Sequence, residues 1–190
     1  MKLVLASRNA HKVRELGDLL VPHELEALPD DVVLPPEDGL TFTANALDKA
    51  RAAAAALGRP AVGDDSGIEA AALNGAPGVR SARFAGENAT DGENLAKLLE
   101  EAPAGTGLAY VCVLAYVDAD GAEHSFTGRC TGVVAAHPRG TGGFGYDPAF
   151  LPDDTDDDRT MAELDPAEKH AISHRGRAAR ALLAHLNAAS

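Results

Sequence analysis

The stretch from Ala61 to Gly67, read A-V-G-D-D-S-G, constrains this chain most, because a short apolar approach ends in two adjacent carboxylates, a hydroxyl and a glycine. If Ala61 to Gly63 is a strand, Asp64 and Asp65 stand at its end, where α/β proteins gather their functional sites. Adjacent strand residues point to opposite faces, so the two carboxylates are expected to have different roles. One of them could face a hard cation, since Mg²⁺ is usually held by one or two carboxylates plus substrate phosphates. The alternative is an acidic turn, because Asp-Asp-Ser-Gly is also good turn chemistry.

Length and charge limit the class of protein. A chain of 190 residues fits one domain, or one domain with two lobes, and is long enough to bury a real core. We expect a single domain over residues 1–190. Hydrophobic residues make up 45% of the chain, which is typical of a globular protein. The formal net charge of -12 argues against a protein that coats nucleic acid, because such binding depends on basic patches.

The apolar runs and the cysteines bear on location. The longest strongly apolar run, residues 109–117, is half the length that a membrane helix needs. The apolar part of residues 1–6 is too short for a signal peptide. Cys112 and Cys130 are too few for a disulfide framework, and Cys112 lies inside the apolar run, as a buried thiol would. The sequence therefore predicts a cytoplasmic protein without membrane contact, with reduced thiols.

A strand-to-helix turn is expected near the N-terminus. Leu3 to Ala6 reads as a buried strand, and a helix is expected from Ala10 after the polar break S-R-N. Free backbone N–H groups at such a turn make an anion site. Lys12 lies in the first helical turn, where the helix dipole disfavours a cation unless an anion binds there. The alternative, equally open from the sequence, is that Asn9 only caps the helix and Lys12 is solvated.

The rest of the chain reads as alternating strands and capped helices. Thr41 or Thr43 can cap a helix that ends before Gly58, and T-D-G-E at residues 90–93 matches a capping box. The segment 153–158, with five aspartates, is interpreted as a solvated loop rather than a metal site. The remaining expected elements are a strand over 24–28, an extended segment over 79–84, an antiparallel hairpin of 108–117 and 123–135, a helix start at 165–168 and a last helix from 174 to about 186.

Two later segments carry candidate binding residues. The loop 140–148 is too rich in glycine for a packing element, and its backbone could approach a ligand closely. Phe144 and Tyr146 could offer ring faces to a base, or could lie in the core beside a mobile linker. Lys169, His174 and Arg175 gather near the start of the last helix, where cations are disfavoured unless an acceptor is present. The alternative is a set of scattered solvated bases.

Six sequence blocks, in order from about Leu3 to Leu186, resemble the Ham1/inosine triphosphatase family. The blocks are S-R-N-A-H-K, G-L-T-F-T-x-N-A, G-D-D-S-G, N-G-A-P-G-V-x-S-A-R-F, G-T-G-G-F-G-Y-D-P-x-F and E-K-x-A-I-S-H-R-G. The resemblance implies an α/β fold with a long mixed β-sheet, flanking helices and two lobes that enclose a nucleotide cleft. It also implies a homodimer, a Mg²⁺ requirement, and hydrolysis of ITP, dITP or XTP to the monophosphate and pyrophosphate. Such an activity removes deaminated purines from the nucleotide pool.

The resemblance further implies residue roles. Asp65 falls at the proton acceptor and metal ligand, and Glu37 falls at a second acidic metal ligand. The loop before Thr160 is unusually acidic, and Tyr146 stands where some relatives have tryptophan. The implied substrate-binding residues are Ser7, Arg8, Asn9, Ala10, His11 and Lys12 for the triphosphate, Ser66 beside the substrate, and Phe144, Gly145, Tyr146, Asp147, Lys169, His174 and Arg175 for the base.

Two other functions compete with this expectation. A nucleotide-binding module without chemistry would bind nucleotide without turnover, although the three carboxylates Glu37, Asp64 and Asp65 together speak against it. Another phosphohydrolase could remove a single terminal phosphate, which would release orthophosphate instead of pyrophosphate.

Overall fold

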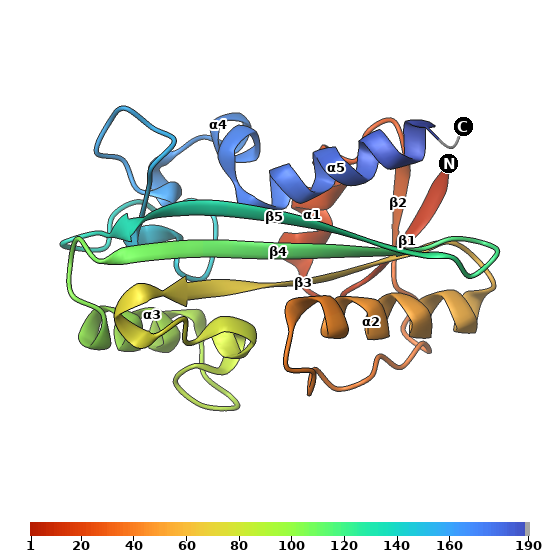
Figure 1. The fold of residues 1–190 in the computed structure, drawn as a ribbon, viewed down its shortest axis with the longest axis horizontal. Helices are drawn as coiled ribbons and strands as arrows, with labels where there is room; N and C mark the ends of the chain where they lie inside the picture. The colour runs from red at the N-terminus through yellow and green to blue at the C-terminus, as the bar shows by residue number, and fades with distance from the viewer. Residues whose placement is uncertain (189–190) are drawn as a thin grey trace. The chain divides into compact units, whose positions relative to one another are not determined.

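The computed structural model describes residues 1–188 and contains a six-stranded mixed sheet in the order β2-β1-β3-β4-β5-β6 (Figure 1). The strands are β1 Lys2–Ala6, β2 Glu24–Ala27, β3 Ala61–Ala70, β4 Gly107–Val117, β5 Glu123–Val134 and β6 Phe150–Pro152. The helices are α1 Ala10–Leu19, α2 Phe42–Leu57, α3 Asp91–Glu101, α4 Pro166–Ile172 and α5 His174–Ala188, with short 3-10 turns η1 Ala71–Leu73, η2 Gly78–Arg83, η3 Asp147–Ala149 and η4 Met161–Glu163.

The chain divides into two compact units built from interleaved segments. Unit 1 comprises residues 1–65, 112–128 and the chain from 175 onward, and unit 2 comprises residues 66–111 and 129–174. Strands β3, β4 and β5 each contribute residues to both units. The expected mixed sheet with flanking helices is confirmed: β1 pairs in parallel with β2 and β3, and β5 pairs antiparallel with β6.

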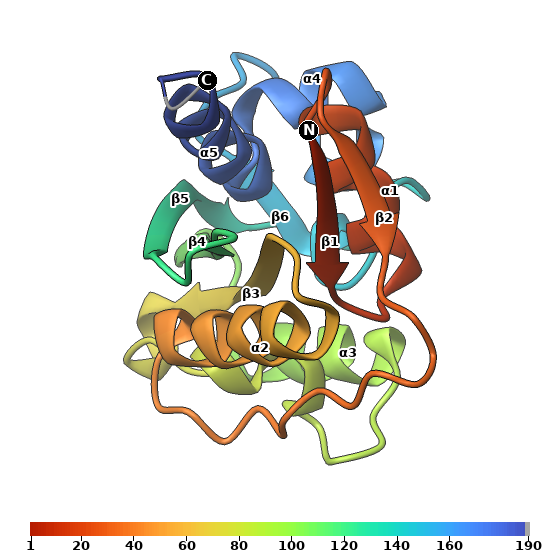
Figure 2. The ribbon, with the colours of Figure 1, turned by 90° about the vertical axis from the view of Figure 1, so that its right-hand side faces the viewer.

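Unit 1 covers both faces of its strands with helices (Figure 2). Leu3 and Leu5 of β1 pack in one cluster with residues of α1 and α5, whereas Val4 and Ala6 pack in another that includes Ala53 of α2. This strict alternation follows from the two-residue repeat of a strand, and burial of both faces explains why the strands read as continuous apolar runs. Along β4, Cys112, Leu114 and Tyr116 join the α1 and α5 cluster, and Val113, Ala115 and Val117 join a cluster with α2.

Unit 2 has its own apolar core, formed by the second half of β3, the first half of β4, α3 and the segments that follow β5. Ile68, Leu98, Tyr110, Phe150 and Met161 all belong to it and are at most 6% exposed. Each unit therefore buries an apolar cluster made entirely of its own residues.

The helix starts follow the sequence signals. Asn9 caps α1, Thr41 caps α2, and Thr90 and Asp165 form reciprocal capping boxes at α3 and α4. Gly58 ends α2 in the left-handed conformation, with φ of 60°, as the sequence predicts. None of the helices found within residues 1–188 is both long and apolar enough to cross a membrane.

Two expectations are wrong. The G-D-D-S-G stretch is neither a strand end nor a turn: it lies inside β3, which continues to Ala70 because both carboxylates find partners and the following residues are buried. The segment 79–84 is not extended, because residues 78–83 form the 3-10 turn η2. Ser81 stabilises that turn, since its hydroxyl donates to the Gly78 carbonyl at 2.6 Å and accepts from the Ile68 N–H at 2.8 Å.

The contact between β3 and α2 gives a stability prediction. A Cβ on Gly63 would overlap the carbonyl oxygen of Ala46, whereas a Cβ on Gly17 of α1 would meet nothing within 4 Å. We expect Gly63→Ala to lower the free energy of unfolding by about 3 kcal/mol, at the upper end of overpacking effects. Gly17→Ala is the matched control and should raise it by about 0.5–1 kcal/mol, since alanine is the better helix former. Denaturant titration of both variants checks this, and an unaffected Gly63→Ala protein would contradict the packing.

Candidate functional site

Asp64 is the centre of a buried charge cluster in unit 1. Its side chain is fully buried and forms an ion pair with the ammonium of Lys12 from α1. Arg175 of α5 donates from Nε to Oδ2 of Asp64 at 3.3 Å, and the Cys112 thiol of β4 donates to the same oxygen at 3.3 Å. Burial and the Asp64 charge raise the pKa of Cys112 well above its usual range, so this thiol stays protonated and remains a donor.

Arg175 has a second carboxylate partner. Its Nη1 lies 2.6 Å from Oε2 of Glu15 on α1, and the guanidinium is only 1% exposed. Burial lowers the pKa of Arg175, but the charges of Asp64 and Glu15 outweigh it and raise the pKa. The sequence groups Arg175 with Lys169 and His174, yet its recorded contacts place it with Lys12 and Asp64 in unit 1.

These contacts decide what Asp64 can do chemically. Burial alone would raise its pKa, but the charges of Lys12, Arg175 and Lys49 together hold the pKa well below its usual range. A carboxylate this strongly stabilised in its ionised form is a poor proton acceptor. Asp64 therefore positions cations, and Lys12 obtains an anionic partner from the protein itself despite its place in the first helical turn.

Asp65 faces a different set of partners, as the alternation of strand side chains predicts. Its Oδ2 accepts a hydrogen bond from the Asn45 amide at 2.9 Å, and its Oδ1 lies 4.0 Å from Nζ of Lys49, both on α2. Burial raises the pKa of Asp65, and it outweighs the Lys49 charge and the Asn45 hydrogen bond, which act in the opposite direction. Asp65 is therefore the more basic of the two adjacent carboxylates, which suits a general base.

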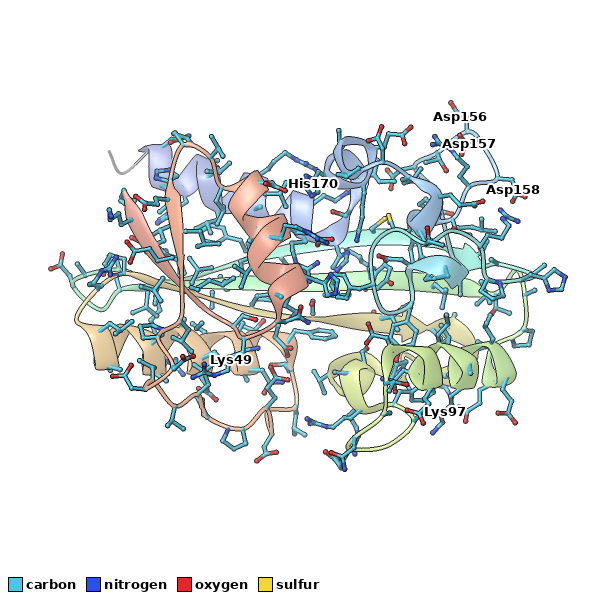
Figure 3. All side chains as sticks on the ribbon, turned by 180° about the vertical axis from the view of Figure 1, so that it is seen from behind. Lys49, Lys97, Asp156, Asp157, Asp158 and His170 are labelled. Carbon is cyan, nitrogen blue, oxygen red and sulfur yellow. The ribbon has the colours of Figure 1, made fainter. Side chains whose placement is uncertain are left out.

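Lys49 joins Asp65 to Glu37. Its Nζ lies 2.5 Å from Oε1 of Glu37 and also donates to the backbone oxygen of Asp64. Figure 3 shows Lys49 on α2. Burial raises the pKa of Glu37, but the Lys49 charge, the Lys49 hydrogen bond and the Lys12 charge together outweigh burial and lower the pKa. Two carboxylates thus gather around one positive charge.

This donor set fits a hard cation. Carboxylate oxygens are what Mg²⁺ prefers, and two of them leave further positions for water and substrate phosphates. Within residues 1–188 no group of three or more His, Cys, Asp or Glu side chains lies together as a complete metal cage would. A divalent ion at Glu37 and Asp65 would complete its coordination with ligands besides these two carboxylates, such as water and phosphate oxygens.

The S-R-N-A-H-K turn is built as a capped helix start. The Asn9 side chain accepts from the backbone N–H groups of His11 and Lys12, at 2.9 and 3.3 Å, and the Ser7 hydroxyl accepts from the Asn9 N–H at 3.2 Å. Arg8 donates to the Val32 carbonyl at 2.8 Å. Asn9, His11 and the first helical residue, Ala10, are exposed. The capping interpretation of Asn9 is confirmed, and the turn remains open to solvent.

Asp147 is the corresponding centre in unit 2. Its Oδ2 lies 2.8 Å from Nζ of Lys169 and accepts from the Phe144 N–H at 2.9 Å, and its Oδ1 accepts from the Tyr110 hydroxyl at 2.9 Å. Lys169 lies in the last turn of α4, the helix whose start is expected at 165–168, so the helix dipole there favours its charge. A Cβ on Gly143 would overlap Oδ2 of Asp147, which explains why the loop needs glycine there.

The aromatic residues of unit 2 differ in exposure. Phe144 is half-buried, and Nζ of Lys169 lies 5.2 Å from its ring centroid. Tyr146 is 6% exposed and donates from its hydroxyl to the Ser81 carbonyl at 2.6 Å, so its burial favours the core interpretation for this ring. The His174 ring stacks on Tyr110 with centroids 4.5 Å apart.

The loop is ordered by contacts within unit 2. The Gly145 N–H donates to Oδ2 of Asp91 at 3.0 Å, and the Gly142 N–H donates to the Ala162 carbonyl at 3.0 Å.

Ser66 is half-buried and follows Asp65 directly in β3. The predicted site residues thus fall into two groups, with Lys12, Glu37, Asp65 and Arg175 in unit 1 and Phe144 to Asp147, Lys169 and His174 in unit 2.

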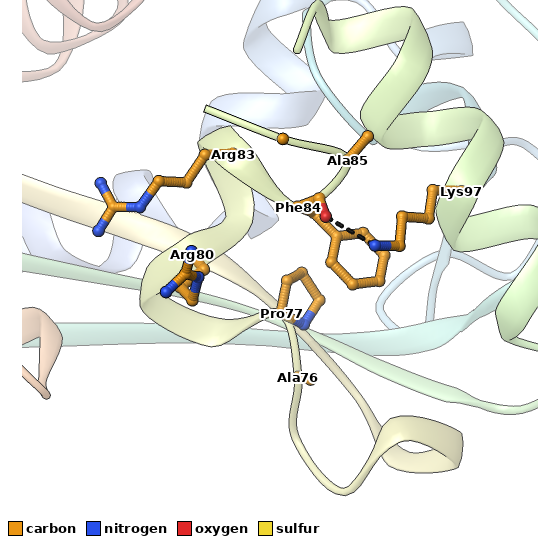
Figure 4. A pocket seen from close by; sticks show the side chains of 8 residues that line it. Ala76, Pro77, Arg80, Arg83, Phe84, Ala85 and Lys97 are labelled. Atoms are coloured by element: carbon orange, nitrogen blue, oxygen red, sulfur yellow. Dashed lines mark hydrogen bonds between the residues drawn. The ribbon is translucent and has the colours of Figure 1, made fainter. Parts of the chain in front are cut away.

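A separate hollow of about 410 Å³ lies in unit 2 and contains none of the predicted site residues (Figure 4). Pro77 and Phe84 form apolar parts of its lining, and Nζ of Lys97 donates to the Phe84 carbonyl at 2.9 Å. Arg80 also lines it, but its side chain is 65% exposed and lies 3.4 Å from Glu87, as an ordinary surface charge does.

The acidic loop behaves as a solvated segment. Its aspartates are exposed, and Figure 3 shows Asp156, Asp157 and Asp158 together on the loop between β6 and α4. Their exposure confirms the interpretation of residues 153–158 as a solvated loop.

Sequence reasoning missed four buried polar residues that complete the two clusters. Lys49 and Asn45 lie one turn apart within an alanine-rich helix, where a polar residue facing inward interrupts the apolar pattern. Glu15 interrupts the apolar face of α1 in the same way. Tyr110 had no such signal, because a tyrosine in an apolar strand also fits an ordinary core.

The Asp64 cluster gives a prediction on stability and pH. We expect Asp64→Asn to lower the free energy of unfolding by about 3–5 kcal/mol at neutral pH, because it leaves Lys12 and Arg175 partly uncompensated. The folded pKa of Asp64 is lowered, so its contribution is present above the unfolded pKa of about 3.9 and is lost as pH falls below it. Denaturant titrations between pH 7 and pH 3 should therefore show a shallower loss for Asp64→Asn than for the unsubstituted protein. Equal slopes would contradict the assignment.

Comparison with known proteins places the chain in a family. The Ham1 family model matches residues 3–185. The dITP/XTP pyrophosphatase of Geobacter sulfurreducens is 46% identical over 97% of this chain and 96% of its own length, and that of Mycobacterium tuberculosis is 48% identical over 96% and 93%. Among solved structures, a HAM1 protein from Coxiella burnetii superposes with a TM-score of 0.86 at 42% identity, covering 98% of both chains. The Staphylococcus aureus Ham1 protein gives 0.87 at 37% identity, covering 100% of both. With nearly its whole length matched, the chain belongs to the Ham1 family.

Proposed function

We propose that this protein hydrolyses ITP, dITP and XTP to the nucleoside monophosphate and pyrophosphate. Relatives that match almost end to end are named dITP/XTP pyrophosphatases. The observation that carries the proposal is the difference between the two adjacent carboxylates of β3. Cations hold Asp64 ionised, whereas Asp65 has a raised pKa beside Glu37. Asp65 provides a base, and the Lys12 ammonium that Asp64 holds provides positive charge, both of which phosphoryl chemistry needs.

Asp65 acts as the general base in this proposal. Its Oδ2 is held by Asn45, so Oδ1 is the oxygen that faces Lys49 and can accept a proton from the attacking water. Lys12 lies at the start of α1 and is 13% exposed, so it can offer its charge to the phosphate tail while it stays bound to Asp64.

Glu37 and Asp65 would hold Mg²⁺ together with phosphate oxygens. When bound, the ion would neutralise phosphate charge and lower the pKa of a coordinated water. Lys49 would hold the Glu37 carboxylate and Asn45 the Asp65 carboxylate in position for the ion.

The residues of unit 2 account for base choice in this proposal. Lys169 and His174 offer hydrogen-bond donors, and lysine has no acceptor. Hypoxanthine and xanthine present a carbonyl oxygen at position 6, whereas adenine presents an amino group there. A site built to donate rejects the amino group because its own donors stay unpaired. Phe144 supplies a half-buried ring that can stack on the base.

The setting of the enzyme also belongs to the proposal. Cys112 and Cys130 are both buried as reduced thiols, which fits a reducing compartment such as the cytoplasm. We further propose that residues 1–190 act as one catalytic domain and that the protein is a homodimer, which light scattering coupled to gel filtration measures directly.

The first functional prediction concerns substrates and products. With Mg²⁺ present, ITP, dITP and XTP should release pyrophosphate, and ATP should be turned over at least about 10²-fold less efficiently in kcat/KM. The screen scores pyrophosphate and orthophosphate separately. Orthophosphate alone would indicate removal of a terminal phosphate, and nucleotide binding without either product would indicate a binding module.

The second prediction concerns Asp65. We expect Asp65→Asn to reduce kcat by about 10²–10⁴-fold, because the amide is neutral and not basic. The fold should persist, since an amide oxygen can still accept from Asn45. Asp48→Asn on the exposed side of α2 is the matched control and should keep its kcat, because Asp48 pairs with Arg51 at the surface. Near-normal turnover in Asp65→Asn would refute the assignment.

A further inference from the structure

Asn45 is a buried amide in the first turns of α2. It is 2% exposed, and its backbone N–H bonds to the carbonyl of the capping residue Thr41 at 3.2 Å. A buried amide is unfavourable unless its hydrogen bonds are made, and asparagine is a poor residue for a helix interior. Its presence on the inward face of an alanine-rich helix therefore needs a reason in its contacts.

The two ends of the amide have different partners. Nδ2 donates to Oδ2 of Asp65 at 2.9 Å, and Oδ1 accepts from the Gly39 N–H at 2.8 Å. A carboxylate can only accept and a backbone N–H can only donate, so these partners fix which end of the amide is which. The amide thus has a unique orientation.

This orientation ties together the two carboxylates assigned to the metal. Asp65 is bonded directly, and Gly39 is two residues after Glu37 in a loop whose neighbour Leu40 is 93% exposed. A Cβ on Gly39 would overlap Oδ1 of Asn45, so the loop approaches as closely as glycine allows. One turn later in α2, Lys49 bonds Glu37 from the same side.

We propose that Asn45 is a positioning residue: it holds Oδ2 of Asp65 and the loop of Glu37, so that Oδ1 of Asp65 and the Glu37 carboxylate face a common point. The inference rests on the proposed function for its catalytic consequence. The contacts of Asn45 are with residues of unit 1, and their effect on metal binding can be measured without the reaction.

The chain provides a matched control in Asn94. Asn94 is also 2% exposed, and its N–H also bonds to the carbonyl of a capping threonine, Thr90, at 3.0 Å. Its Oδ1 likewise accepts from a loop N–H, that of Ala85, at 2.8 Å. Its Nδ2 donates instead to a backbone carbonyl, that of Ala82, at 3.1 Å. The two asparagines therefore match in position, burial and bonding, and differ in what Nδ2 holds.

The experiment compares Asn45→Ala and Asn94→Ala in the full chain. Both should lower Tm by a similar amount, on the order of 5 °C, because both lose two buried hydrogen bonds. Only Asn45→Ala should reduce kcat, by about 10–100-fold as for residues that orient a metal ligand, with KM for ITP changed less than about threefold. Titration with Mn²⁺ as the metal probe should show about tenfold weaker binding in Asn45→Ala and unchanged binding in Asn94→Ala.

A second substitution separates the two bonds of Asn45. Asn45→Asp keeps the size and the acceptor for the Gly39 N–H but replaces the amide donor to Asp65 by a carboxyl oxygen, which repels Asp65 when ionised, so kcat is compared with Asn45→Ala at alkaline pH, where both carboxyls are ionised. It should reduce kcat at least as much as Asn45→Ala if the orientation of Asp65 is what matters. A kcat close to that of the unsubstituted protein would show that anchoring the loop suffices, and would overturn the assignment to Asp65.

The outcomes distinguish the two proposals. If the unsubstituted protein releases no pyrophosphate, the proposed function fails, and the Mn²⁺ titrations still test the positioning role. If it is active but Asn45→Ala keeps its kcat and Mn²⁺ affinity while losing as much Tm as Asn94→Ala, Asn45 is only structural and the inference fails. Loss of kcat and Mn²⁺ affinity confined to Asn45→Ala supports it.

Discussion

The ion pair network of Asp64 is the interaction on which unit 1 depends. Placing a carboxylate in a fully buried position is very unfavourable unless cations and donors surround it, and here α1, β4 and α5 each supply one. Because every partner comes from a different element, the charge is satisfied only when all of them are docked. The same network brings Lys12 and Arg175 to β3. The Asp64 side chain thus both stabilises the packing of these elements and positions two candidate substrate-binding residues.

The sheet then separates two kinds of carboxylate at consecutive positions. Asp64 faces α1 and α5 and is neutralised, while Asp65 faces α2 and keeps a raised pKa. The two neighbouring carboxylates have such different partners because side chains one residue apart in a strand point to opposite faces of the sheet. Gly63 lets α2 approach β3 closely just before this pair, because any Cβ there would meet the helix backbone.

Local signals made much of the fold predictable. Threonine and asparagine caps, the glycine after α2 and the apolar runs each act within a few residues, so the sequence alone is informative about them. The prediction failed where partners outside the local segment decide the outcome. Asp64 and Asp65 stay in a strand because side chains of α1, α2 and α5 pair with them, and Ser81 closes η2 through β3. Sequence motifs were enough to name most candidate site residues, but they did not show which side chains those residues contact. Nothing local shows that Arg175 meets Glu15 across 160 positions, although the repeated pattern T-x-x-x-N at 41–45 and 90–94 does mark two buried asparagines.

The charge balance of unit 1 explains why such a site would use a divalent cation. Glu15, Glu37, Asp64 and Asp65 meet Lys12, Lys49 and Arg175 there, and these seven side chains together carry one net negative charge in formal terms. A triphosphate approaching this cluster would meet repulsion rather than attraction. The protein as a whole, at a formal charge of -12, adds to that repulsion. One Mg²⁺ reverses the sign of the cluster, whereas another lysine would only cancel it and would also compete for the carboxylate oxygens that the reaction needs.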